Sequence, residues 1–147
     1  MNIVSLAVSA KKGTRKSLVP KASLVCNHGL EGDAHAGPWH RQVSFLASES
    51  IACARDKGLD VDFGDFAENI ATRGIDWLSV PVGTILRLGH DAEVQITQIG
   101  KECHKKCAIY YKAGDCIMPK EGVFAKVLKE GVVHVGDEIV FVDSASR

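Results

Sequence analysis

The stretch that decides the fold is TILRLGHDAEVQITQI, residues 84–99. Two apolar arms, 84–88 and 92–99, flank the turn-forming Gly89-His90-Asp91, and in the second arm Val94 and Ile96 alternate with polar residues. Alternation with a period of two on either side of a glycine-containing turn predicts a β-hairpin. Short segments of the same character before and after this hairpin predict that the rest of the chain is also rich in strands.

Two helices and several further strands are expected along the rest of the chain. A helix is expected over 48–58, with Ser48 as its N-cap and Gly58 as its end. A second helix is expected over 119–128, because Pro119 suits a helix start and the apolar residues form i,i+4 pairs. The phrases VGTIL (82–86) and VGDEI (135–139) both read as a tight turn that leads into a strand. The other expected strands are 3–8, 23–26, 42–46 and two short pieces within 132–142.

Length and composition point to one globular domain over residues 1–147. About seven short strands with one to three short helices in a chain of this length favour a mainly β protein, a compact barrel. The chain has 18 Lys and Arg against 18 Asp and Glu, and this neutral balance argues against nucleic acid or a membrane surface as a partner. No apolar run approaches the length of a spanning helix, and no basic segment precedes the first apolar stretch. We therefore expect a cytoplasmic protein.

Five cysteines form an odd count, which excludes a complete set of disulfides within the chain. Cys26 and Cys53 fall in an expected strand and helix, and we expect both in the core. Cys103 and Cys107 instead stand among three lysines and His104, where positive charge stabilises a nucleophilic or metal-binding thiolate. Zinc held by this group together with Cys116 is the alternative, although the spacing is a poor match to structural zinc sites.

Three other segments carry more reactive residues than folding needs. The basic run 11–17 suits an anion, or is a solvated loop. The loop 29–41 holds Asp33, His35 and His40, which are possible metal ligands, members of a self-satisfied polar loop, or the lining of a pocket. In segment 64–76, Glu68, Asn69 and Arg73 suit a heterocyclic or anionic ligand, and a structural role is equally open.

In this order the segments resemble the MOSC family, named after the C-terminal domain of molybdenum-cofactor sulfurase, from about residue 3 to 142. The chain is most similar to the short bacterial stand-alone members. The resemblance implies a mostly β, barrel-like fold with mixed strand pairing, and a role in handling the molybdenum cofactor or sulfur destined for a metal centre. The phrases that carry it are GLEGDAHAG (29–37), RQVS (41–44), FAENI (66–70), QIGKECH (98–104) with Cys107, and GDCIMPKEGVF (114–124).

The resemblance also implies roles for particular residues. Cys107 matches the family's characteristic cysteine. It would either carry sulfur as a persulfide loaded by a cysteine desulfurase, or ligate molybdenum while basic residues hold the phosphate of the pterin. Cys103 and His104 would take part in catalysis, either by resolving a persulfide or by tuning Cys107, and the choice of Cys107 over Cys103 as the primary cysteine rests on motif position. The expected cofactor-binding residues are Lys16, Ser17, His35, Arg41, Asn69, Arg73 and Lys101.

The expected function is therefore that of an accessory protein that binds the molybdenum cofactor, carries sulfur for its maturation, or does both. No pyridoxal phosphate is expected in this chain, because the family's long members carry it in a separate domain. The expected partners are a cysteine desulfurase or molybdopterin-processing protein and a recipient molybdoenzyme. Two alternatives remain: a molybdenum-dependent reductase of N-hydroxylated compounds, and a non-catalytic module whose cysteines hold zinc or nothing.

Overall fold

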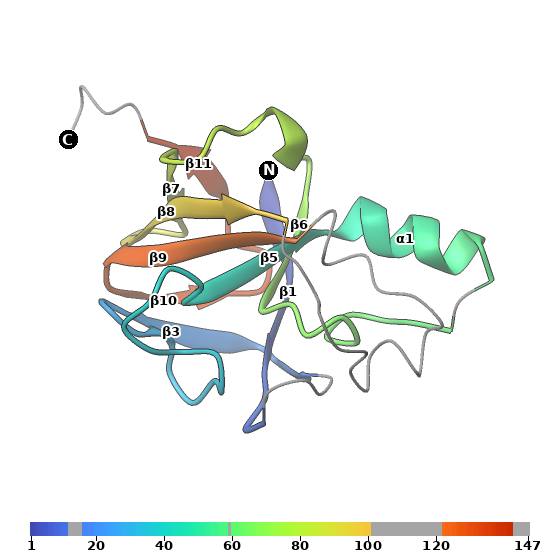
Figure 1. Ribbon diagram of the computed structural model, residues 1–147, viewed down its shortest axis with the longest axis horizontal. Coiled ribbons are helices and arrows are strands. Elements are labelled where there is room, and N and C mark those ends of the chain that lie inside the picture. Colours follow the sequence, from blue (N-terminus) through green and yellow to red (C-terminus); the bar gives the residue numbers. More distant parts are fainter. Residues whose placement is uncertain (12–15, 59, 101–121, 143–147) are drawn as a thin grey trace.

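The computed structural model describes residues 1–11, 16–58, 60–100 and 122–142. Over these residues the chain forms eleven strands, one α-helix and one 3₁₀-helix (Figure 1). The strands are β1 (Asn2–Val8), β2 (Ser17–Val19), β3 (Lys21–Val25), β4 (Gly29–Leu30), β5 (Val43–Ala47), β6 (Ile70–Arg73), β7 (Ile85–Leu88), β8 (Ala92–Ile99), β9 (Val123–Lys129), β10 (Gly131–His134) and β11 (Ile139–Phe141). The helices are α1 (Ser48–Asp56) and η1 (Trp77–Ser79).

Eight strands form one large sheet in the order β11-β7-β8-β9-β5-β6-β1-β2, and three form a small sheet in the order β10-β3-β4. Only β5 and β6 pair in parallel; every other pair of these strands is antiparallel. The mainly β class and the mixed pairing are therefore confirmed. The predicted hairpin is also confirmed, since β7 pairs with β8 in register from Ile85↔Gln95 to Leu88↔Ala92.

The sheets of the described residues are not closed into a barrel. The large sheet ends at β11 and β2, although it curls far enough for Asn2 to bridge to Glu138 and for residues 1–3 to share backbone hydrogen bonds with residues 136–139. The count also exceeds the expected seven, because strands of two or three residues such as β2 and β4 are too short to show alternation in the sequence. The two VG phrases are confirmed as turns, with Gly83 and Gly136 at positive φ just before β7 and β11.

The large sheet is covered on both faces. One face packs against the small sheet around a core that includes Phe45, Val123 and Leu24. The opposite face is covered by α1 and the segment after it, with Leu46, Ile51 and Phe66 fully or almost fully buried there. In Figure 1 the small sheet lies below β9 and β5, and α1 extends to the right. The described residues include no helix long and apolar enough to cross a membrane.

The expected helix over 119–128 is wrong where the structure describes it, because 123–129 is strand β9. Val123, Ala125 and Val127 point into the core beside the small sheet, and Phe124 into the core beneath α1. The start of this strand, Val123–Ala125, is buried on both faces and reads as a continuous apolar run, which also satisfies helical spacing. The register against β5 and β8 decides in favour of the strand.

Two smaller expectations also need correction. The first helix exists, but Ser48 is its first residue and Ala47 its N-cap, and Gly58 at positive φ follows its end. Cys26 and Cys53 are both exposed rather than in the core. Cys26 lies one residue beyond β3, and Cys53 lies on the outer side of α1, whose buried residues are Ile51 and Ala54.

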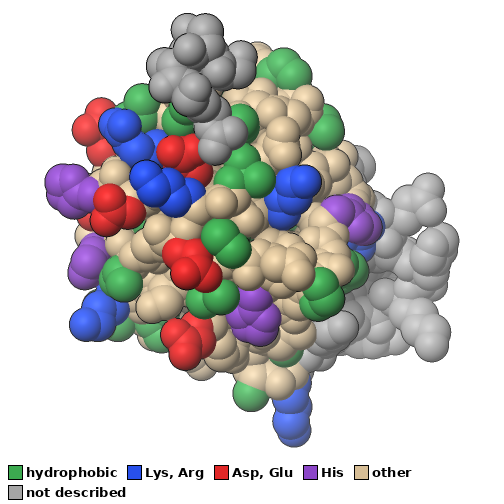
Figure 2. All heavy atoms as spheres, turned by 90° about the vertical axis from the view of Figure 1, so that its left-hand side faces the viewer, with side chains coloured by type: hydrophobic (Ala, Val, Ile, Leu, Met, Phe, Trp, Pro, Cys, Tyr) green, Lys and Arg blue, Asp and Glu red, His purple; other side chains and the backbone are tan. Residues whose placement is uncertain are grey.

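Both signs of charge occur on the molecular surface. Figure 2 shows a face on which acidic, basic and histidine side chains alternate with small apolar patches. The described part of this face therefore presents no extended field of one sign, in agreement with the neutral balance of the sequence.

Candidate functional site

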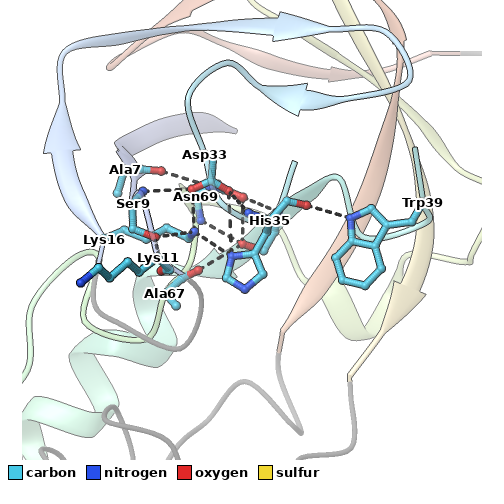
Figure 3. Close-up of polar contacts among 10 residues, drawn as sticks. Ala7, Ser9, Lys11, Lys16, Asp33, His35, Trp39, Ala67 and Asn69 are labelled. Atoms are coloured by element: carbon cyan, nitrogen blue, oxygen red, sulfur yellow. Dashed lines mark hydrogen bonds and ion pairs between the residues drawn. The ribbon is translucent and has the colours of Figure 1, made fainter. Parts of the chain in front are cut away.

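A buried ion pair between Lys16 and Asp33 is the centre of the polar cluster in Figure 3. Lys16 Nζ donates to Asp33 Oδ1 at 2.7 Å, and both side chains are fully buried. The ammonium also lies 3.3 Å from Ser9 Oγ and 3.0 Å from His35 Nδ1. Lys16 precedes β2 and Asp33 follows β4, so the pair joins one edge of the large sheet to the loop that leads into β5.

Asp33 also accepts two backbone hydrogen bonds. The N–H of Ser9 donates to Oδ1 at 3.0 Å and that of His35 to Oδ2 at 3.2 Å. Burial by itself raises the pKa of Asp33, but the hydrogen bond and charge of Lys16, with Ser9 and Asn69, hold that pKa below its ordinary value. Asp33 is thus an ionised carboxylate held in place by its neighbours.

Asn69 connects β1, β5 and β6 at the edge of the same cluster. Its Oδ1 accepts the N–H of Ser44 at 3.0 Å and the Ser44 hydroxyl at 3.1 Å, and its Nδ2 donates to the carbonyl of Ala7 at 3.1 Å. Asn69 is fully buried. These contacts explain why an amide, with both donor and acceptor, stands directly before β6.

Glu68, next to Asn69, is a fully buried carboxylate inside a tight turn. The N–H of Gly64 donates to Oε2 at 2.7 Å and that of Phe66 to Oε1 at 3.2 Å. Burial raises the pKa of Glu68 to about 7; the two N–H groups act against this rise, and the nearby charge of Asp65 adds to it. A carboxyl that changes its charge near neutral pH is a common feature of functional sites.

A second group of cationic and aromatic side chains surrounds Arg41. Its Nε donates to Gln98 Oε1 at 3.0 Å, and its guanidinium carbon lies 5.1 Å from the centre of the Phe124 ring and 6.0 Å from that of Trp39. His40 Nε2 is 2.9 Å from the same Gln98 oxygen. Among the described residues, Arg41 forms no ion pair with a carboxylate, whereas Lys16 does.

An irregularity in β8 positions Gln98 for this contact. Ile96 pairs with Ala125, but Gln98 already pairs with Phe124, so two residues of β8 oppose one of β9. A bulge of this kind re-aims side chains locally. The hydroxyl of Thr97, the extra residue, donates to the carbonyls of His40 and Phe124. These contacts connect the loop before β5 to β8 and β9.

Trp39 joins the two groups. Its ring N–H donates to the carbonyl of His35 at 2.7 Å, and its ring meets that of His40 edge to face with centroids 5.7 Å apart. The indole is partly exposed, at 38%. The loop 33–41 therefore places a cation, two imidazoles and an exposed aromatic ring along one continuous edge.

The predicted cysteine segment begins and ends at this edge. The Gly100 N–H donates to the carbonyl of Gly122 at 2.6 Å, and Gln98 Nε2 donates to the carbonyl of Gly100 at 2.6 Å. Gly100 and Gly122 are therefore paired two residues beyond Gln98, the residue that contacts Arg41. Lys101, Cys103, His104, Cys107 and Cys116 lie outside the described residues.

Comparison with known proteins gives this arrangement a family. The sequence model of the MOSC domain matches residues 32–140, about three quarters of the chain. The chain belongs to the MOSC family. MOSC domains are associated with molybdenum-cofactor-related proteins. The match covers the loop 33–41, the Glu68-Asn69 pair, the end of β8 and the cysteine segment.

Several solved structures share the fold of this chain. The chain is similar to YiiM from Geobacillus stearothermophilus, with 25% identity, a TM-score of 0.74, and coverage of 97% of this chain and 75% of that one. It is similar in fold to the YuaD protein from Bacillus subtilis, at 18% identity and a TM-score of 0.75 over 93% and 92% of the two chains. YiiM from Escherichia coli is 24% identical, with a TM-score of 0.68 over 97% and 70%. No curated protein sequence matches the chain at a significant level.

Within this MOSC domain, contacts connect Lys16 with His35, and His35 with Arg41 through Trp39, whereas Asn69 is fully buried beside Asp33. Ser17 is exposed at the start of β2, directly after Lys16. Arg73 lies elsewhere, at the far end of β6, where the register places it opposite Asn2. The sequence interpretation assigned no role to Gln98 or Ser9, because their partners are 57 and 24 residues away and no local pattern reports such contacts.

A separate cleft of about 410 Å³ lies near the start of α1, lined by residues such as Glu49, Trp77 and Ile99. Partial burial acts to raise the pKa of Glu49, but hydrogen bonds from Gly74, its own N–H and Ser48, with the charge of Arg73, hold that pKa below its ordinary value. The polar cluster around Lys16 does not line this cleft.

No group of three His, Cys, Asp or Glu side chains within the described ranges lies close enough to hold a metal ion. The described part of loop 29–41 thus gives no support to Asp33, His35 and His40 as a metal site.

Proposed function

We propose that the chain is an accessory protein that holds the molybdenum cofactor along the edge formed by loop 33–41 and the end of β8. The observation that carries this proposal is the geometry of Arg41. This guanidinium is fixed by Gln98, lies against two aromatic rings, and is not neutralised by a described carboxylate.

The residues at this edge fit such a ligand. A guanidinium binds phosphate oxygens through paired N–H donors, and an exposed indole offers a face on which a flat heterocycle can stack. The imidazoles of His35 and His40 add further hydrogen-bonding groups beside Arg41 and Trp39. Lys16 contributes less net charge than the sequence suggested, because Asp33 neutralises it.

The cysteine segment supplies the soft ligand in this proposal. Cys107 follows Gly100 by seven residues, and Gly100 is held beside Gln98. A bound cofactor would supply a molybdenum centre for sulfur or oxygen transfer. The chain itself would bind the phosphate through Arg41, orient the heterocycle against Trp39, and present a thiolate from Cys107.

The same thiolate supports the sulfur-carrying form of the proposal. A cysteine desulfurase would transfer a sulfur atom from its own persulfide to Cys107. The protein would carry this sulfur as a persulfide and pass it on for the cofactor of a recipient molybdoenzyme. Both chemistries need one nucleophilic cysteine beside an anion-binding edge, so they share the residues named above.

The test compares Arg41→Gln with a matched arginine control. Loss of a charged hydrogen bond costs about 1.5–3 kcal/mol, which corresponds to roughly a tenfold to hundredfold loss of affinity. We expect Arg41→Gln protein, purified without oxygen from a molybdate-fed host, to retain at most about a tenth of the pterin that the unaltered protein retains. The readout is the fluorescence of oxidised pterin per chain.

Arg87 provides the control, because it is exposed on β7 and lies away from the edge. Arg87→Gln should retain pterin at the level of the unaltered protein. Equal loss in both variants, or equal retention, would remove Arg41 from the binding site and with it the main support for the proposal.

A further inference from the structure

The ion pair between Lys16 and Asp33 surrounds one ring nitrogen of His35 in a way that binding of a phosphate does not require. The ammonium lies 3.0 Å from His35 Nδ1 and 2.7 Å from Asp33 Oδ1. Asp33 Oδ2 is farther from the same nitrogen, at 4.0 Å, and accepts the backbone N–H of His35 instead. A buried ion pair contributes little net stability, so its arrangement calls for another explanation.

The contact with Lys16 fixes where the imidazole carries its proton. An ammonium group has only N–H donors, so a nitrogen at hydrogen-bond distance from it must be the acceptor. A neutral imidazole that accepts at Nδ1 carries its single proton at Nε2. A second proton on the ring would place two positive charges about 3 Å apart, which buried surroundings oppose.

The usual partner of a histidine Nδ1–H is a carboxylate or a carbonyl, which makes Nε2 a lone-pair acceptor or a metal ligand. Here the carboxylate is present, but Lys16 stands between it and the ring. The donor and acceptor nitrogens of the imidazole are therefore exchanged relative to a carboxylate–histidine pair.

We propose that Lys16 is a positioning residue that holds His35 as the neutral tautomer protonated at Nε2, so that the ring offers an N–H donor to an anionic ligand. The tautomer follows from the contacts of Lys16 alone, whereas its use toward a ligand rests on the proposed function. The His35 side chain is 27% exposed, and its second ring nitrogen turns away from Lys16 (Figure 3).

This assignment narrows the chemistry of the ligand. An imidazole protonated at Nε2 donates to oxygen or sulfur acceptors, and it offers no lone pair on that nitrogen to a metal cation. Lys16 would then act on the ligand through His35, and Arg41 would supply the charge. The site is suited to an oxyanion such as a phosphate group and unsuited to a cation.

The direct test is the tautomer of His35, measured by ¹⁵N–¹H NMR of histidine-labelled protein without ligand at pH 8. The His35 signals are identified by their loss in His35→Gln. We expect one set of ring correlations, which corresponds to a single tautomer with an unprotonated Nδ1 and a protonated Nε2. A proton on Nδ1, or exchange between both tautomers as in the exposed His90, would overturn the assignment.

Variants separate Lys16 from Asp33. In Lys16→Met the nearest acceptor for the ring is Asp33, so the proton should move to Nδ1 or occupy both nitrogens, and Lys16→Arg should restore the original pattern. In Asp33→Asn the contact of Lys16 with the ring remains, and the pattern should stay unchanged. Lys126→Met, an exposed lysine on β9, is the control. Unchanged signals in Lys16→Met, or altered signals in Asp33→Asn, would contradict the proposal.

Inorganic phosphate tests the use of the donor. Its addition should shift the Nε2–H signal of His35 and leave the signal of His90 in place. If the His35 signal does not shift selectively, the ligand part of the proposal is wrong. The spectra without ligand do not depend on cofactor binding. If the protein retains no pterin, the proposed function is contradicted but the tautomer assignment still holds. If NMR shows the other tautomer, the assignment is contradicted but the test of pterin retention by Arg41 is unaffected.

Discussion

At the scale of single residues, Glu68 links the stability of the fold to pH. Its carboxyl is fully buried, and burial raises its pKa from the ordinary 4.5 to about 7. The folded protein therefore holds this proton more tightly than the unfolded chain does. The stabilisation is complete below about pH 4.5 and is lost as the pH rises through about 7.

We expect the free energy of unfolding to fall between pH 5 and pH 8 by up to about 3 kcal/mol more in the unaltered protein than in Glu68→Gln. Glutamine cannot ionise, so its profile should be flatter even though the variant is less stable overall through the loss of one N–H acceptor. Urea denaturation at the two pH values measures the difference. Parallel profiles for the two proteins would show that Glu68 keeps an ordinary pKa when folded.

Asp33 acts in the opposite direction and at lower pH. Its pKa is held below 3.8 in the folded state, so its contribution is present above about pH 4 and is lost as the pH falls through its folded pKa. A fall in pH thus protonates Asp33, the partner of Lys16, whereas a rise in pH through about 7 ionises Glu68.

Single residues also show what the sequence could and could not predict. Asn69 was proposed from the residue types of its segment and Arg41 from a family resemblance, but the contact between Arg41 and Gln98 spans 57 positions and leaves no local pattern. Lys16 was expected in a basic loop, and only the fold reveals Asp33 beside it. Cys26 and Cys53 were expected in the core because cysteine is usually buried, yet each lies where its element meets solvent.

At the scale of elements, the turn that encloses Glu68 packs directly on the chain before β2. Gly64 has φ +85°, and a Cβ built on it would lie 2.3 Å from the carbonyl oxygen of Lys16. The N–H of Lys16 in turn donates to the carbonyl of Gly64 at 2.8 Å. Glycine is therefore required here both for its backbone angle and for the close approach.

We expect Gly64→Ala to destabilise the protein by about 1–3 kcal/mol more than Gly83→Ala does. Gly83 is a matched control, since its φ is +98° and a methyl group added there would meet no atom within 4 Å. Both variants carry the strain of a left-handed alanine, about 1–2 kcal/mol, so the difference isolates the contact with Lys16. Denaturant midpoints at one pH measure it, and equal losses would mean that the turn and the Lys16 segment are not in close contact.

Elements with a clear period were predicted well, and buried strands were not. The hairpin of β7 and β8 alternates between core and solvent, and both arms lie within one residue of the expected bounds. The first three residues of β9, Val123–Ala125, are buried on both faces of the sheet, and the spacing of Val123 and Val127 fits a helix as well as a strand. Only its pairing with β5 and β8 separates the two interpretations, and pairing is a tertiary property.

At the scale of the whole molecule, the candidate site exists only where several segments meet. Ser9 follows β1, Asp33 and Arg41 lie in one loop, Asn69 precedes β6, and Gln98 is the next-to-last residue of β8. The mainly β class follows from hydrophobic alternation, but neither the open edges of the large sheet nor this meeting point follows from any one segment. The family resemblance predicted which segments contribute to the candidate site, and the fold shows that Lys16 is already paired with Asp33.

The central claim is that this edge holds the molybdenum cofactor or sulfur through Cys107. The measurement that tests it most directly is the molybdenum, pterin and added sulfur per chain in anaerobically purified protein, by elemental analysis, pterin fluorescence and intact mass, for the unaltered chain and Cys107→Ala. We predict molybdenum with pterin, or one additional sulfur, in the unaltered protein and its loss in Cys107→Ala. Stoichiometric zinc with none of the three, or full occupancy in Cys107→Ala, would contradict the account.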